Sequence, residues 1–364
     1  MKFVFLMALC CSWLLVGLAV SAGAADESRG DLSAAAPHVS ETDDAIVIKV
    51  GDRPVLQYNK SNTQPPDGID PIYARSGYIH PIFSPSGTMV SGHYPADHPH
   101  QTGLFNAWVN ATFRGHAVDF WNIKKGLGRV AHAKVLRVEN HDDRAEFSAE
   151  LVHEDIHDPQ SVVTVLRERW DVVVREAPIG FVIDITSTHR CATDDPLVIN
   201  EYRYGGMAIR GSGEWYSDQA PGAAKQYAKA IENGEQTETP ELQVMGHAFV
   251  TSESKDRYDG NHSRPNWIAM YGPSGGNLNG ESNGSNACIA ILNHESNFRS
   301  PQPVRLHPSK PYGCFAPMVA GTFQIKPGEE YVCQYRLIIQ DGLPDAKKLD
   351  RQWQRFNRIS DAKR

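Results

Sequence analysis

Three histidines and one aspartate fall within one short stretch, SGHYPADHPHQTGLFNAWVN (residues 91–110), as His93, Asp97, His98 and His100. His98 and His100 are two positions apart, and the proline between them favours an extended backbone, so both imidazoles are predicted to face one side. Such a pair can transfer protons or donate hydrogen bonds to a sugar or a carboxylate. We therefore predict His98 and His100 as proton-transfer groups.

Metal binding is the alternative for the same stretch. His93, His98 and His100 are nitrogen ligands of the kind that divalent transition metals prefer. The chain has no H-E-x-x-H motif, no phosphate-binding G-x-x-x-x-G-K-[ST] and no nucleophile elbow. We expect no cofactor, and a divalent metal at these three histidines remains the alternative.

A carboxylate partner for the histidines comes from NEYRYGGMAIRGSGEWYSD (residues 200–218). Glu201 and Arg203 are predicted to share one face of a strand, and Gly205 and Gly206 allow a close approach of the backbone. A glutamate at a strand end can act as a general acid or base when its surroundings shift its pKa. We predict Glu201 as the second catalytic group; an exposed Glu–Arg pair is the alternative.

Other polar groups lie beside aromatic residues, as a carbohydrate site requires. A tryptophan ring stacks on the apolar face of a sugar while neighbouring polar groups bond to its hydroxyls. GHAVDFWN (115–122) combines these types, and the proline-rich loop 292–313 crowds histidines and arginines, including Arg305 and His307. The predicted substrate contacts are Arg75, Asp119, Trp121, Arg203, His294 and Arg299. The tryptophans could instead fill the core.

Short runs of alternating apolar and polar residues predict the strands that position these side chains. AIVIKV (45–50) and the run after Gly51-Asp52-Arg53 predict a hairpin, and RAEFSAELVH places Ala145, Phe147, Ala149 and Leu151 on one face. Further strands are predicted at 130–139, 144–153, 161–174, 180–188, 196–210, 287–294 and 331–340. No strand–helix–strand alternation occurs, which favours a mostly β fold with a large antiparallel β-sandwich.

Two segments depart from this β pattern. Residues 212–246 are predicted to carry a short helix around AAKQYAKAIENG or a long loop. Leu349, Trp353 and Phe356 have helical spacing, which predicts a C-terminal helix over 344–357 that packs on the sandwich. With no repeat or second boundary, residues 44–364 are expected to form a single β-sandwich domain.

The N-terminus has the pattern of an export signal. Lys2, an apolar run from Phe3 to Val20 and the small residues Ala22-Gly23-Ala24 predict a cleaved signal peptide over 1–24, followed by a flexible linker over 25–43. A transmembrane anchor is the alternative. We expect a periplasmic or extracellular protein without a membrane span after cleavage.

Composition limits the partners and the redox chemistry. The net charge is −7 and no basic block occurs, which argues against nucleic-acid binding. After cleavage Cys191, Cys288, Cys314 and Cys333 remain; they could form two disulfides or stay as free buried thiols. The expected partner is a small-molecule or oligosaccharide ligand.

Several blocks together resemble a known family. These are YIHPIFSPSGTMVSGHYPADHPHQTGLFNAWV, GHAVDFWN, EYRYGGMAIR, NHESNFRSPQPVRLH and YRLIIQDG. The chain resembles an exported bacterial family called methane oxygenase-like (PmoA-like), of unknown function and common in planctomycetes, over about residues 45 to 342. The resemblance implies a supersandwich similar to galactose mutarotase and to some glycoside hydrolases. Gln101 stands where the family often has another histidine, which disfavours a three-histidine metal site.

The residues and the resemblance favour an exported carbohydrate-active enzyme, a glycoside hydrolase, lyase or epimerase that acts on a glycan fragment by His/Glu acid–base chemistry. Two alternatives remain open. One is a metal-dependent oxidoreductase or hydrolase at His93, His98 and His100. The other is a glycan-binding module without catalysis.

Overall fold

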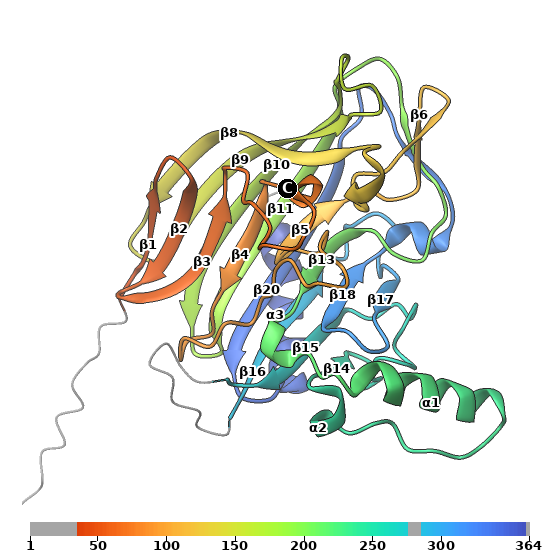
Figure 1. The fold of residues 1–364 in the computed structure, drawn as a ribbon. Coiled ribbons are helices and arrows are strands. Elements are labelled where there is room, and N and C mark those ends of the chain that lie inside the picture. The colour runs from red at the N-terminus through yellow and green to blue at the C-terminus, as the bar shows by residue number, and fades with distance from the viewer. Residues whose placement is uncertain (1–34, 276–284, 362–364) are drawn as a thin grey trace, which may run out of the picture. The chain divides into compact units, whose positions relative to one another are not determined.

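The computed structural model describes residues 35–275 and 285–361, whose strands form two large antiparallel sheets and one small one (Figure 1). The expected signal peptide and the start of the expected linker lie outside these residues. The linker prediction was too long, because Pro37–Glu41 forms strand β1 and pairs with β2. The mostly β, antiparallel fold predicted from the sequence is confirmed.

The first sheet has the order β1-β2-β3-β4-β5-β13-β18-β17. Its strands are β1 (Pro37–Glu41), β2 (Ala45–Val50), β3 (Arg53–Asn59), β4 (Tyr78–Ile82), β5 (Leu104–Ala107), β13 (Gly206–Arg210), β17 (Val304–Leu306) and β18 (Tyr312–Phe315). The predicted hairpin is the β2–β3 pair. Strand β13 lies between β5 and β18, so it joins the two chain segments that carry most of the polar clusters.

The second sheet has the order β14-β15-β16-β20-β11-β10-β9-β8. Its strands are β8 (Arg129–Asn140), β9 (Ala145–Asp155), β10 (Val163–Ala177), β11 (Gly180–Cys191), β14 (Ala248–Thr251), β15 (Trp267–Pro273), β16 (Asn286–Asn293) and β20 (Tyr331–Asp341). Ala145, Phe147, Ala149 and Leu151 are all buried, as their alternation predicts. These side chains pack against residues of the first sheet in one shared core.

A third, small sheet has the order β19-β12-β6-β7. It contains the first part of a segment that the sequence predicted as one continuous strand. Its strands are β6 (Ala111–Phe113), β7 (His116–Val118), β12 (Leu197–Ile199) and β19 (Phe323–Ile325). The single strand predicted over 196–210 is therefore wrong: β12 and β13 belong to different sheets. The chain turns between them at Gly205 and Gly206, whose φ angles are 136° and 86°.

Helices cover parts of the sandwich. Helix α1 (Ala220–Glu232) and the short α2 (Leu242–Met245) lie beside β14 (Figure 1), which confirms a helix in the segment 212–246. Helix α3 (Ala346–Asp361) contacts β16 and β20. Its Leu349 and Phe356 bury against the outer face of the second sheet, as the helical spacing predicts. No helix among the described residues is long and apolar enough to cross a membrane.

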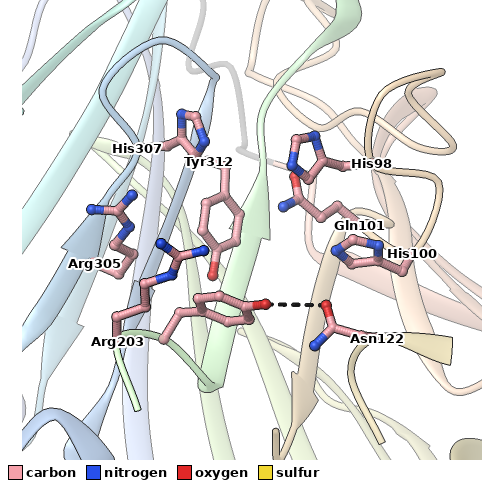
Figure 2. Close-up of a pocket in the computed structure, with 9 residues that line it drawn as sticks. His98, His100, Gln101, Asn122, Arg203, Arg305, His307 and Tyr312 are labelled. Atoms are coloured by element: carbon pink, nitrogen blue, oxygen red, sulfur yellow. Dashed lines mark hydrogen bonds between the residues drawn. The ribbon is translucent and has the colours of Figure 1, made fainter. Parts of the chain in front are cut away.

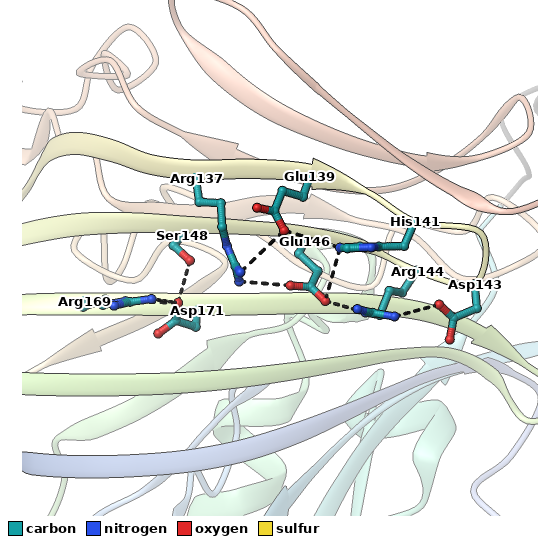
Figure 3. Close-up of polar contacts among 9 residues, drawn as sticks. All are labelled: Arg137, Glu139, His141, Asp143, Arg144, Glu146, Ser148, Arg169 and Asp171. Carbon is teal, nitrogen blue, oxygen red and sulfur yellow. Dashed lines mark hydrogen bonds and ion pairs between the residues drawn. The ribbon is translucent and has the colours of Figure 1, made fainter. Parts of the chain in front are cut away.

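The outer face of β8, β9 and β10 carries a polar network instead (Figure 3). Glu146 accepts hydrogen bonds from Arg137 and Arg144, and Asp171 accepts hydrogen bonds from Arg169 and Ser148. The alternation of the strands therefore separates a charged outer face from the apolar inner face.

Candidate functional site

A pocket of about 230 Å³ is lined by loops of the first sheet, and its lining residues come from distant parts of the sequence. Its lining is polar and aromatic: His98, His100, Gln101, Asn122, Arg203, Tyr204, Arg305, His307 and Tyr312. Figure 2 shows Arg203, Arg305 and His307 on one side and His98, His100 and Gln101 on the other. Three of the predicted site residues, His98, His100 and Arg203, therefore share one pocket.

Two turns, and not an extended strand, present His98 and His100. The amide of His98 donates to the carbonyl of Pro95, and the amide of Gln101 donates to that of His98. The loop closes where the amide of Gly103 donates to Gly92. Gly103 has a φ of 52°, and a Cβ there would lie 2.1 Å from the carbonyl oxygen of Ile79, so only glycine fits.

Asp97 lies between His98 and Lys310 and contacts both. The Nδ1 atom of His98 lies 3.3 Å from Oδ2 of Asp97, within ion-pair range although not aligned as a hydrogen bond, and Lys310 forms an ion pair with the same oxygen. Burial raises the pKa of Asp97, but the contacts with His98 and Lys310 outweigh it and hold this pKa below the usual range. Asp97 therefore stays ionised and can orient the imidazole of His98.

The other two histidines of the pocket are neutral at physiological pH. Burial lowers the pKa of His100 to about 3, and burial together with the charge of Arg305 lowers that of His307 to about 3. The Nδ1 atom of His307 accepts hydrogen bonds from the amides of Ser309 (3.2 Å) and Lys310 (3.1 Å). Its hydrogen is therefore on Nε2.

Two arginines give the pocket its positive charge. Neither Arg203 nor Arg305 forms an ion pair within the described chain, whose other surface arginines mostly do. Arg305 donates to Oδ1 of Asn261 at 3.1 Å, and the guanidinium of Arg203 lies 5.8 Å from the ring of Tyr204. No aspartate or glutamate is among the nine lining residues. The pocket is therefore built to receive negative charge.

Tyr204 and Asn122 form a hydrogen-bonded pair in the pocket lining. The hydroxyl of Tyr204 donates to Oδ1 of Asn122 at 3.1 Å, the contact drawn in Figure 2, and burial raises the pKa of Tyr204 to about 12. Asp119 accepts hydrogen bonds from the amide and the side chain of Asn122. Asp119 thus positions Asn122 and does not contact the pocket itself, contrary to the prediction.

Two other predicted contacts support the pocket from within the core. Arg75 is 2% exposed and donates to the carbonyl oxygen of His100 at 3.1 Å. Trp121 is buried, with its ring 5.4 Å from Tyr204 and 4.7 Å from Phe105. Both predictions of substrate contact are corrected: these side chains hold the lining residues in place, because each is enclosed by the sandwich.

The remaining predicted residues lie elsewhere. Glu201 is exposed and belongs to no strand, so it does not share a strand face with Arg203, and it does not line the pocket. His294 packs its ring against Phe356 of α3. Arg299 donates to the carbonyls of Pro317 and Gly321, which fixes the loop between β18 and β19.

The three-histidine cluster is also divided. His93 stacks on His80 with ring centroids 4.5 Å apart and does not line the pocket. In the described chain, neither group of three metal-ligand side chains that lie close together includes His93, His98 or His100. All four cysteines of the described chain are free thiols, which resolves the two alternatives for them.

The sequence from residue 45 to 354 matches DUF6807, a family of unknown function. The chain belongs to this family. The match does not connect it with the PmoA-like name. No curated protein sequence matches the chain.

Two solved structures of sugar-processing proteins are similar over 84% of the chain. The GH36 α-galactosidase AgaB of Geobacillus stearothermophilus has 10% identity and a TM-score of 0.35, and the chain spans 41% of its length. A galactose mutarotase related enzyme of Lactobacillus acidophilus has 8% identity and a TM-score of 0.28, with 97% of its length covered.

Sequence reasoning missed most of the lining. Gln101, Asn122, Tyr204, Arg305, His307 and Tyr312 were not among the predicted site residues. The clusters around 200–218 and 292–313 contained Tyr204, Arg305 and His307, so local crowding of polar residues was a usable signal. Tyr312 also lies in the second of these clusters, Gln101 directly follows His100, and Asn122 ends GHAVDFWN, but only the fold brings these segments together.

Proposed function

We propose that the pocket binds an anionic sugar, a uronate residue of a glycan, and that the protein is a carbohydrate-active enzyme of the lyase or epimerase type. The observation that carries this proposal is the pair of guanidiniums without carboxylate partners, Arg203 and Arg305, opposite His98. Arginine binds carboxylates through two parallel hydrogen bonds, which fixes both the charge and the orientation of the sugar.

The lining disfavours glycoside hydrolysis. Most glycoside hydrolases use two carboxyl groups that flank the scissile bond. Glu201, the expected carboxylate, is outside the pocket, and Asp97 already pairs with Lys310. A reaction that relies on imidazole, phenol and guanidinium groups fits these residues better.

Proton abstraction next to a carboxylate is such a reaction. Arg203 and Arg305 would neutralise the sugar carboxylate, which makes the hydrogen on the adjacent carbon more acidic. His98, oriented by Asp97, would take this proton. In a lyase the resulting electron pair forms a C=C bond as the neighbouring C–O bond breaks, and Tyr204 gives its proton to the departing oxygen. In an epimerase a proton returns to the opposite face.

The size of the pocket suits one sugar residue. Its volume of about 230 Å³ is below the roughly 300–1,000 Å³ typical of pockets for drug-sized ligands. The pocket would thus hold the reacting residue while the rest of the glycan extends into solvent. We also propose that residues 1–24 direct export, which N-terminal sequencing of the secreted protein would test.

The test is an assay of the purified mature chain on uronate-containing and neutral glycans. We expect ultraviolet absorbance from an unsaturated uronate, or deuterium uptake from D₂O at the carbon next to the carboxylate, with uronate glycans alone. Cleavage of neutral glycans would contradict the proposal. If the protein binds uronate glycans but gives neither signal, the catalytic role is refuted and the protein is a glycan-binding module.

A further inference from the structure

A second group of ligand-type side chains is enclosed between the two large sheets, away from the pocket. His153 of β9, Glu168 of β10 and His189 of β11 each have a fully buried side chain. Glu168 pairs directly with His189, and His153 pairs with Leu166, two positions before Glu168. All three side chains therefore point to the inner face of the second sheet.

The donor atoms of these residues converge. The Nε2 atom of His153 lies 2.8 Å from Oε2 of Glu168, and Nε2 of His189 lies 3.5 Å from the same oxygen. All three atoms lie within 4.8 Å of one another. Ligands about 2.0–2.2 Å from a tetrahedral zinc ion are themselves roughly 3.4 Å apart, which the separation of His189 and Glu168 matches. The 2.8 Å between His153 and Glu168 is a hydrogen bond, which an ion would replace.

Glu168 has a fully buried carboxylate, whose Oε2 atom faces the Nε2 atoms of both histidines. Its other oxygen accepts hydrogen bonds from Asn106 (3.0 Å), Ser187 (2.6 Å) and Trp170. No lysine or arginine of the described chain pairs with it; Arg75 instead donates to His100. A buried carboxylate without a lysine or arginine partner is well suited to bind a cation.

Polar atoms without partners gather at the same place. Within the described chain, Nε2 of His189, Nδ1 of His153, Oδ1 of Asn106 and Nε1 of Trp108 are buried and form no hydrogen bond. The ring of Trp108 lies 5.4 Å from that of His189. Buried polar atoms are normally satisfied, so a group of exceptions indicates that an ion or ordered water belongs among them.

We propose that His153, Glu168 and His189 bind one divalent transition-metal ion of the zinc type, through the two Nε2 atoms and Oε2. Two imidazoles and one carboxylate are a ligand set that such ions accept, with a water as the fourth ligand. Ser187 contacts both Glu168 and, at 3.4 Å, Nδ1 of His189, and so orients two of the ligands. The ion would link β9, β10 and β11 through one ligand from each strand.

The surface cluster of Figure 3 offers a matched control. Glu139, His141 and Glu146 are also close enough to share an ion. Arg137 and Arg144 already pair with Glu146, so a metal ion there would face two positive charges. We expect no metal at this second cluster.

Metal content of the purified full chain, produced with Zn²⁺ in the medium, tests the proposal. We expect about one equivalent per chain in the wild type and in His141→Gln, and a loss of most of it in His189→Gln and Glu168→Gln. Substoichiometric metal in the wild type, or metal retained by His189→Gln but lost by His141→Gln, would overturn the assignment.

A second measurement needs no variant and therefore does not depend on whether the variants fold. Wild-type chain is unfolded in urea in the presence of a chelator, refolded without metal, and then titrated with Zn²⁺. We expect the Tm to rise to a plateau at one equivalent. A Tm that Zn²⁺ leaves unchanged would refute the site and assign the unpartnered atoms to ordered water.

Discussion

The imidazoles of His98 and His307 face each other across the pocket, with ring centroids 6.0 Å apart and planes at 74°. One comes from the loop between β4 and β5 and the other from the turn between β17 and β18. Because burial keeps His307 neutral, His98 can take up a proton without a second imidazolium beside it. Of the two, His98 also has a carboxylate beside it, that of Asp97, and it is the one that we propose as the base.

Replacement of the base tests the chemistry directly. His98→Gln should lower kcat by about 10²–10⁴-fold, the usual contribution of a general base, while the Kd for a uronate glycan changes little. His116→Gln is the control, because His116 pairs with Asp155 outside the pocket. Equal turnover by the His98 variant and the wild type would remove His98 from the mechanism.

The arginines should determine affinity for the anionic group. A hydrogen bond to a charged group contributes about 1.5–3 kcal/mol, so Arg203→Ala or Arg305→Ala should weaken binding of a uronate glycan by roughly 10–150-fold. Arg114→Ala, which removes an exposed ion pair with Asp195 and a contact with the ring of Phe113 outside the pocket, should leave the Kd unchanged. Calorimetric titration at two salt concentrations checks both points, since the wild-type affinity should fall with salt.

Acid should destabilise the fold through the neutral histidines. The pKa values of His80, His100 and His307 are lowered to about 3, against about 6.5 in the unfolded chain. Between these values the unfolded state binds more protons, so the stability present above pH 6.5 is lost as the pH falls toward 3. The lowered pKa of Asp97 acts in the same direction.

Melting curves between pH 7.5 and 4.5 provide the measurement. The Tm of the wild type should fall across this range, and His307→Asn should flatten the dependence. A Tm that is constant or rises toward pH 4.5 would contradict the neutral state of these rings.

Gly103 should be irreplaceable. Gly103→Ala combines a positive φ with a Cβ against the carbonyl of Ile79, so we expect a loss of more than about 3 kcal/mol in the free energy of unfolding. Gly115 has a φ of 82° and no atom within 4 Å of a Cβ, so Gly115→Ala should cost only about 1 kcal/mol. Urea unfolding compares the two; similar losses would show that the contact with Ile79 can relax.

The sequence predicted those parts of the fold that depend on local alternation. The run from Ala145 to Leu151 and the helix containing Leu349 and Phe356 repeat a simple period, so their buried faces could be assigned. The prediction of one strand over residues 196–210 was wrong, because the run of apolar and aromatic residues gives no sign of the turn within it. Residues 200–205 separate β12 from β13, and both Gly205 and Gly206, the first residue of β13, have a positive φ, which alternation does not indicate.

The sequence identified His98, His100 and Arg203 of the candidate site, each within a local cluster of polar residues. His98 and His100 share one loop and could be chosen from their types and spacing. Glu201 was chosen on the same ground and lies outside, because the direction of its side chain depends on a strand that does not form. Arg305 and Tyr312 reach the pocket through the pairing of β13 with β18, which no local pattern specifies.

Strand β20 lies in the middle of the second sheet, paired with β11 on one side and β16 on the other. Until Tyr331–Asp341 has left the ribosome, the four strands β8 to β11 and the three strands β14 to β16 have no direct link. The sheet therefore cannot be completed during most of synthesis, and its closure depends on contacts between distant segments, which form slowly. A nascent chain of this kind stays incompletely folded until nearly all of it has been made.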